Sequence, residues 1–161
     1  MKKGLLSLAA VAVLWSASPQ LAEAHCQIPC GIYHDDMVFH VLDEDVETVA
    51  KMVEMMNVSE CPKKSQVLLR NQFTRAVTNK DTYADKIAHT ISEYFLQQRI
   101  KMDDPDLQKK LAGAHKVLVL AMKVKQAPDE AAVGALKDSL EAFKALMAPQ
   151  IPPDAPPLPL N

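Results

Sequence analysis

Apolar residues recur every three or four positions along most of this chain, which is the spacing of amphipathic helices. This spacing predicts a first helix over about 35–56 and a second, longer helix over about 65–101. A third helix is expected to begin at Asp103-Asp104-Pro105, because an acidic cap followed by a proline is a typical helix start, and a fourth helix is expected to begin at Ala127-Pro128-Asp129-Glu130. No segment shows the alternation of a β-strand. Four such helices with short connections predict an all-α fold, an up-and-down four-helix bundle.

The same spacing predicts which side chains of each helix face the core. One residue on these faces is not apolar, because Lys80 falls on the inner face of the second helix. Such a lysine usually extends its amine to solvent or marks a local break in the helix, here at residues 78–81, and the alternative is a cation held near a site. The predicted inner residues are Val38, Leu42, Val46, Val49, Val53 and Met56; Leu69, Phe73, Ala76, Ala84, Ile87, Ile91 and Tyr94; Leu107, Leu111, Ala114, Leu118, Ala121 and Val124; and Val133, Leu136, Leu140, Phe143 and Met147.

The two ends of the chain differ in composition from its middle. Residues 1–24 contain two lysines, a short apolar stretch and the ending Ala-Glu-Ala, which together predict an export signal removed by signal peptidase before His25. The protein is therefore expected to be exported, to a periplasmic or extracellular location. Residues 149–161 are rich in proline and are expected to form an extended tail. Residues 25–148 remain as one domain with a single core.

The charge balance excludes some classes of partner. The chain has 18 basic and 20 acidic residues, a formal net charge of −2, and it has no cluster of basic residues. This composition gives no electrostatic reason to expect a nucleic acid or an anionic membrane surface as partner. Removal of residues 1–24 also removes the apolar stretch of the leader, so no membrane partner is expected after cleavage.

The most distinctive chemistry lies at residues 25–33, His-Cys-Gln-Ile-Pro-Cys-Gly-Ile-Tyr. If His25 is the first residue of the mature chain, then its α-amine and imidazole, a peptide nitrogen and the thiolates of Cys26 and Cys30 share one short loop, an N-terminal metal-binding hook. Two thiolates and two nitrogens from consecutive atoms of one chain bind in a plane. This favours nickel(II) or copper(II), because zinc prefers a tetrahedron. The residues thus indicate a redox-active nickel or copper site.

The residues alone leave other interpretations open. Cys26 and Cys30 could form a small disulfide loop in an oxidising compartment. A thioredoxin-type pair has two intervening residues, not three, and a structural zinc site needs four side-chain ligands that the sequence does not supply at matching spacing. His34 and His40 could join a site, although a solvated histidine is the commoner case. Cys61 lies in a predicted connection.

The segment H-C-x-x-P-C-G-x-Y resembles the nickel hook of the nickel superoxide dismutases. All six fixed positions match, and residues 93–101 and the all-helical pattern are also similar to that family. The resemblance implies an enzyme that disproportionates superoxide to O₂ and H₂O₂ by Ni(II)/Ni(III) cycling, with one nickel ion per chain. The alternatives are an exported nickel- or copper-binding protein without turnover, and a helical interaction module whose N-terminus is closed by a disulfide. The matching residues are His25, Cys26, Pro29, Cys30, Gly31 and Tyr33.

By this resemblance the metal ligands are His25, through its amine and its axial imidazole, Cys26, through nitrogen and sulfur, and Cys30. Tyr33 and Tyr94 are implied to stand near the open face of the nickel site as catalytic residues. Members of the family are homohexamers of four-helix bundles, so a homo-oligomer is expected.

Two features depart from the family. Gln27 replaces a common aspartate. In the family an acidic and a basic residue support the axial imidazole. In this sequence the acid could be Asp43 or Glu44 and the base Arg75 or Lys80.

Overall fold

The computed structural model describes residues 35–57 and 65–148 of the chain. Within these ranges it contains the helices α2 (Asp35–Asn57), α3 (Gln66–His89), α4 (Leu107–Gln126) and α5 (Glu130–Met147), a π-helix η1 (Thr90–Arg99), and no strand. The predicted export leader, the hook, Cys61 and the proline-rich tail lie outside the described residues.

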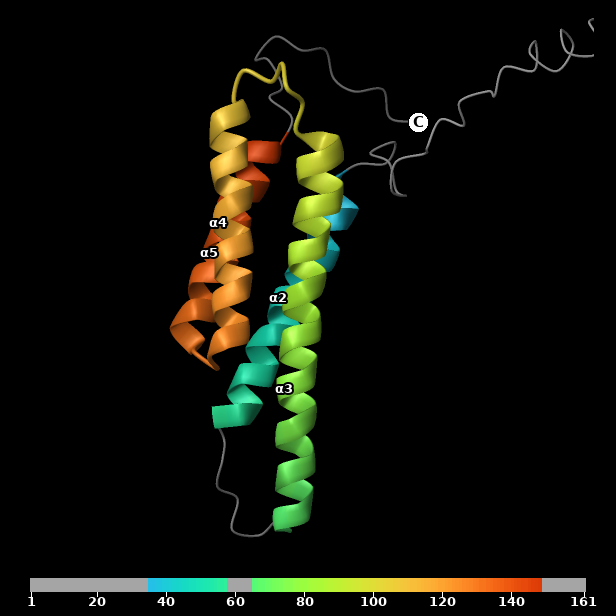
Figure 1. Cartoon of the computed structure of the whole chain (residues 1–161), viewed down its shortest axis with the longest axis vertical. Coiled ribbons are helices and arrows are strands. Elements are labelled where there is room, and N and C mark those ends of the chain that lie inside the picture. Colours follow the sequence, from blue (N-terminus) through green and yellow to red (C-terminus); the bar gives the residue numbers. More distant parts are fainter. Residues whose placement is uncertain (1–34, 58–64, 149–161) are drawn as a thin grey trace, which may run out of the picture.

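The helices α2, α3 with η1, α4 and α5 form a four-helix bundle, which confirms the predicted fold class (Figure 1). Each helix runs opposite to the one before it, and η1 continues α3 without a break. α2 packs on α3 and α5, and α4 packs on α3 and α5, so the helices close around one core. The start of α2, the end of η1 and the start of α4 lie at one end of this bundle, and the end of α4 lies at the other.

An aromatic cluster fills the core near the end where α2 begins. Phe95 of η1 lies 4.8 Å from Phe39 of α2 and 5.1 Å from Phe143 of α5, measured between ring centroids. Tyr94 stands edge-on to Phe95 at 5.0 Å. Edge-to-face contacts of this kind stabilise a core beyond the area that they bury. They fix η1 against both α2 and α5.

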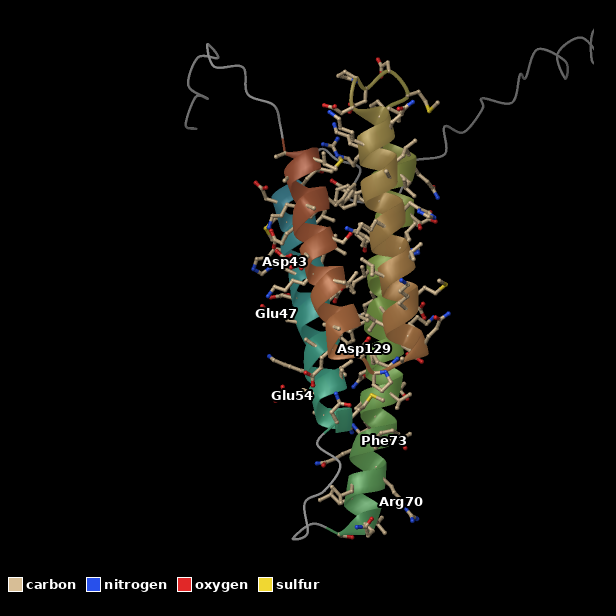
Figure 2. All side chains as sticks on the ribbon, turned by 90° about the vertical axis from the view of Figure 1, so that its left-hand side faces the viewer. Asp43, Glu47, Glu54, Arg70, Phe73 and Asp129 are labelled. Atoms are coloured by element: carbon tan, nitrogen blue, oxygen red, sulfur yellow. The ribbon has the colours of Figure 1, made fainter. Side chains whose placement is uncertain are left out.

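Some predicted core positions are wrong. Phe73 is 50% exposed and Leu111 is 41% exposed, whereas Val117 and Leu120, which were not expected inside, are buried. Phe73 is exposed because the first turns of α3 extend past Asp129, at the start of α5, so α4 and α5 do not cover them and only α2 runs beside part of them (Figure 2). The apolar stripe of α4 is rotated by a small angle from the predicted one, because Val117 and Leu120 replace Leu111 and Leu118 on its buried side.

Lys80 is neither extended to solvent nor placed at a break in the helix, so both of these expectations are wrong. Its side chain is 3% exposed, within an unbroken α3. Its ammonium group donates to the main-chain oxygens of Val124 (2.9 Å) and Lys125 (2.8 Å) and to the carboxylate of Asp81 (2.6 Å). The last turn of a helix leaves carbonyl groups without intrahelical donors and has a partial negative charge. Lys80 supplies the missing donors for α4.

The last two helices begin near the predicted residues, but only α5 has an acidic cap, because the side chain of Asp106 at the start of α4 makes no capping hydrogen bond. The Asp129 carboxylate accepts a hydrogen bond from the Ala131 N–H at 2.9 Å and caps α5. α4 begins at Leu107, two residues beyond the predicted proline, after a turn in which the Asp104 carboxylate accepts from the Asp106 N–H at 2.8 Å. Of the helices described here, none is both long enough and apolar enough to cross a bilayer.

Candidate functional site

The structure describes one of the predicted site residues, Tyr94. His25, Cys26, Cys30 and Tyr33 lie outside the described residues. Within residues 35–57 and 65–148, no group of three or more His, Cys, Asp or Glu side chains is arranged to hold a metal ion. The described part of the site is therefore the surroundings of Tyr94.

Tyr94 is buried, with 6% of its surface exposed, and its hydroxyl group makes a hydrogen bond across the bundle. The hydroxyl donates to Oδ1 of Asp35 at 2.7 Å. Asp35 is the first residue of α2, so this bond joins η1 to the point where the chain leaves residues 25–34 and enters the bundle. The hydrogen bond thus fixes the Tyr94 hydroxyl against Asp35, which follows the predicted hook by two residues.

Arg99 binds the same carboxylate. Its Nε donates to Asp35 Oδ1 at 2.7 Å and its Nη2 donates to Oδ2 at 2.9 Å. This two-point contact is the strongest geometry available to an arginine and a carboxylate. The pKa of Arg99 is raised above its ordinary value, chiefly by the hydrogen bond to Asp35. The side chains of Arg99 and Asp35 are 31% and 15% exposed, so water screens the pair only in part.

The π-helical register explains how two residues of η1 reach one carboxylate. In an α-helix, residues five apart point about 140° away from each other. A π-helix closes i→i+5 hydrogen bonds, so residue i+5 lies one turn above residue i on the same face. Tyr94 and Arg99 are five residues apart in such a helix. Long π-helical segments are rare, and short ones often occur at functional sites.

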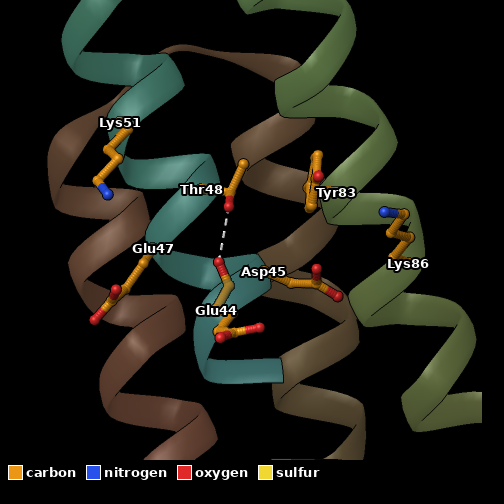
Figure 3. A pocket seen from close by; sticks show the side chains of 7 residues that line it. All are labelled: Glu44, Asp45, Glu47, Thr48, Lys51, Tyr83 and Lys86. Carbon is orange, nitrogen blue, oxygen red and sulfur yellow. Dashed lines mark hydrogen bonds between the residues drawn. The ribbon is translucent and has the colours of Figure 1, made fainter. Parts of the chain in front are cut away.

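A second polar feature is a cavity of about 430 Å³ between α2 and α3 (Figure 3). Asp45, which is 7% exposed, lines it, and Lys86 stands over the Tyr83 ring at 3.9 Å. Burial raises the pKa of Asp45; nearby Lys86 lowers it in part, and Glu44 raises it further. The cavity is lined by Glu44, Asp45, Glu47, Thr48, Lys51, Tyr83 and Lys86.

Comparison with known proteins decides the family. The family model of nickel-containing superoxide dismutase matches residues 20–149, which include the hook segment and all the described helices. The chain belongs to this family. No curated protein and no solved structure matches it.

The family defines the activity and the metal. The protein is a superoxide dismutase, an oxidoreductase that acts on superoxide and uses nickel as its cofactor. Nothing in the comparisons supports a metal-binding protein without turnover. The donor types that residues 25–30 offer fit nickel, because Cys26 and Cys30 carry soft thiolates and main-chain nitrogens lie beside them.

The four candidates for support of the axial imidazole have other surroundings in this dismutase. Lys80 is occupied at the end of α4, and Asp43 accepts from Lys144 at 3.2 Å. Glu44 lines the cavity between α2 and α3, and Arg75 is exposed near the extended part of α3. His25 lies outside the described residues, so their support of its imidazole stays a prediction.

Sequence reasoning did not single out Asp35 and Arg99, which are linked to the Tyr94 hydroxyl. Asp35 was expected only as the start of the first helix (about 35–56), and Arg99 only as part of the family-like residues 93–101. One signal was available, because Asp35 is the first acidic residue after the hook. Nothing in the sequence indicated the π register that brings Arg99 to it.

Proposed function

We propose that the superoxide dismutase activity of this protein resides at its mature N-terminus, with nickel held by His25, Cys26 and Cys30. The observation that supports this location is the hydrogen bond between Tyr94 and Asp35. Asp35 follows Cys30 by five residues, and a chain spans at most about 3.5 Å per residue, so the two Cα atoms are at most about 17 Å apart. The tyrosine that the family resemblance implies at the site thus lies at the end of the bundle to which the proposed ligands are attached.

The reaction converts two superoxide anions and two protons into one O₂ and one H₂O₂. Nickel, when bound, supplies the one-electron exchange between its two oxidation states. The chain's own residues bind the ion, exclude water and fix the groups that superoxide meets. Tyr94 has a positioning role in this scheme, because its hydroxyl proton is directed to Asp35 Oδ1 and its ring is packed against Phe95. Tyr33 is proposed to border the face at which superoxide arrives.

Maturation is part of the proposal, because the amine of His25 exists only after cleavage before that residue. Signal peptidase is proposed to remove residues 1–24 during export, so that the enzyme acts in a periplasmic or extracellular space. The leader pattern supports this. Intact mass of the protein from its native cells checks it: the mass of residues 25–161 is expected, and a chain that keeps residues 1–24 would contradict it.

Assembly with further copies of the same chain is also proposed. Val67, Leu68 and Phe73 are 76%, 44% and 50% exposed on the first turns of α3, which extend past the start of α5. Exposed apolar groups that gather on one part of a surface are typical of an interface. The family resemblance implies a hexamer. Sedimentation at micromolar concentration is expected to show an oligomer, and a fully active monomer would contradict the proposal.

The free N-terminus provides the decisive test of the site. One version of the protein comprises residues 25–161 with His25 free, and a second begins at Ala24. In the second version the His25 nitrogen is an amide, which is a poor donor. We expect about one nickel per chain and rapid superoxide decay for the first version, and weak nickel binding without dismutation for the second. Equal activity in the two versions would show that the terminus is not a ligand.

Cysteine variants give the matched control. Cys26→Ser and Cys30→Ser each replace a soft thiolate by a hard alcohol and are expected to abolish activity. Cys61→Ser makes the same chemical change outside the hook and is expected to leave activity intact.

A further inference from the structure

We propose that Asp35 and Arg99 are positioning residues of the dismutase site. They hold Tyr94 and the start of α2, which closely follows the hook segment, in one fixed arrangement. The inference rests on the proposed function, because it takes residues 25–33 to carry the nickel. It goes beyond that function by assigning a role to two residues that are neither metal ligands nor in the hook.

The first argument is geometric. Asp35 accepts three hydrogen bonds, one from Tyr94 and two from Arg99, at distances of 2.7 to 2.9 Å. Oδ1 accepts from both the Tyr94 hydroxyl and Arg99 Nε, so Arg99 fixes the acceptor that in turn orients the tyrosine. Arg99 therefore acts on Tyr94 through Asp35, across two helices that are far apart in the sequence.

Second, the chain that carries the hook enters the bundle at the start of α2. Asp35 is the first residue of α2 and follows Tyr33 by two residues. The first turn of a helix has no carbonyl acceptors before it and tends to fray. The bidentate contact of Arg99 with Asp35, the first residue of α2, opposes that fraying just after the hook ends. Misplacement of a reacting group by about 1 Å can lower a rate by a factor of about a hundred, so such an anchor matters to the chemistry.

The third argument is the register of η1. Tyr94 and Arg99 share a face only because this segment is π-helical over Thr90–Arg99. The amide of Ile100 continues the pattern and donates to the Phe95 oxygen, five residues back, at 2.9 Å. The Gln98 side chain donates to the Glu93 oxygen, also five residues back, at 3.0 Å. The register is therefore supported by main-chain and side-chain bonds up to Arg99.

The test uses Arg99→Gln in the nickel-loaded protein beginning at His25. Activity per bound nickel is expected to fall about tenfold, a coupling of the size found between groups in contact. Arg99→Lys keeps the charge and is expected to recover part of the loss. If Arg99→Gln does not fold, Asp35→Asn, which keeps the shape of the side chain, takes its place with the same expectation. Activity per nickel equal to that of the parent would overturn the proposal.

A double-mutant cycle separates positioning from general stability. If Arg99 acts through Tyr94, then Arg99→Gln costs about tenfold in the parent but less than about threefold when Tyr94→Phe is already present. Equal losses in the two backgrounds would overturn the assigned route. A readout independent of activity is amide hydrogen exchange at residues 35–39 of the metal-free protein, which is expected to quicken in Arg99→Gln.

Lys110→Gln is the matched control. Lys110 and Asp104 form another partly buried ion pair at the same end of the bundle, at 2.6 Å, with both side chains 16% exposed, and neither residue shares the hydrogen bonds of Asp35 with Tyr94 and Arg99. This variant is expected to lower stability without changing activity per nickel or exchange at residues 35–39. If Cys26→Ser leaves activity intact, the assignment of the nickel site to the hook is wrong. If Cys26→Ser abolishes activity while Arg99→Gln leaves activity unchanged, only the proposed role of Asp35 and Arg99 fails.

Discussion

Replacement of Lys80 by methionine should destabilise the bundle strongly without touching the active end of the molecule. Methionine keeps most of the length and the apolar stem of lysine but removes the ammonium group. That group is almost fully buried and donates to the main-chain oxygens of Val124 and Lys125. Both oxygens belong to the last turn of α4, where no intrahelical donor is available.

The size of the effect follows from the two acceptors. Leaving a buried acceptor without a donor costs about 1–3 kcal/mol. Because α4 ends at the edge of the bundle, where water can reach part of its last turn, we expect a total loss of about 2–4 kcal/mol. A domain of this size has a total stability of only about 5–15 kcal/mol, so the change is large. It corresponds to a decrease in Tm of roughly 10 °C.

Urea unfolding followed by circular dichroism measures this loss, with nickel removed and with protein concentration held constant because assembly shifts apparent stability. Lys116→Met is the control, because Lys116 is an exposed lysine in the middle of α4. It should change the free energy of unfolding by less than about 0.5 kcal/mol. A loss for Lys80→Met as small as that of the control would refute the capping role of Lys80.

Two further predictions concern stability. Gly134→Ala should stabilise the protein by about 0.5–1 kcal/mol, because alanine favours a helix and nothing lies within 4 Å of the new Cβ. Gly113→Ala should gain less stability or lose some, because its Cβ would lie 3.2 Å from both Phe143 and Leu146. The urea midpoints of the two variants test this order, and the reverse order would contradict it. Burial raises the pKa of Asp45 in the folded protein above its ordinary value near 3.8, so the folded state favours the neutral carboxyl group. The stability that this neutral group contributes is lost as the pH rises from 3.8 through the raised pKa. Asp45→Asn should therefore be more stable than the parent at pH 7 and lose this advantage toward about pH 4. Unfolding at the two pH values tests this, and an advantage that does not change with pH would count against it.

The helices could be predicted because each of them buries one stripe of side chains. In α2 and α5 most of the predicted residues are the buried ones, although Phe39 is buried in place of Val38 and Met147 is only partly buried. The prediction failed at Phe73 because periodicity indicates which residues share a face, and it contains no information on where the neighbouring helices stop. That information lies in the connection lengths and the packing of the whole bundle.

The role of Lys80 could not be read from the sequence for a related reason. A lysine on an apolar stripe is unfavourable unless it finds acceptors, and its acceptors are main-chain oxygens about 45 residues away. Every residue has such an oxygen, so no residue type at positions 124 or 125 identifies the partner. The same holds for Arg99, whose partner Asp35 is 64 residues away and whose direction depends on the register of η1.

The register of η1 and the arrangement of the site depend on each other. A π-helix has poorer packing than an α-helix, so ten residues of it persist only where the surroundings determine the register. Here Ile91, Tyr94 and Phe95 are buried in the core, and Arg99 is bound to Asp35. If the segment relaxed to an α-helix while Tyr94 kept its place, Arg99 would turn away from Asp35 by about 140° and lose both bonds. The ion pair therefore stabilises the unusual register, and the register in turn makes the ion pair possible. This mutual dependence is why Arg99, a partly exposed residue outside the hook, bears on where Tyr94 stands.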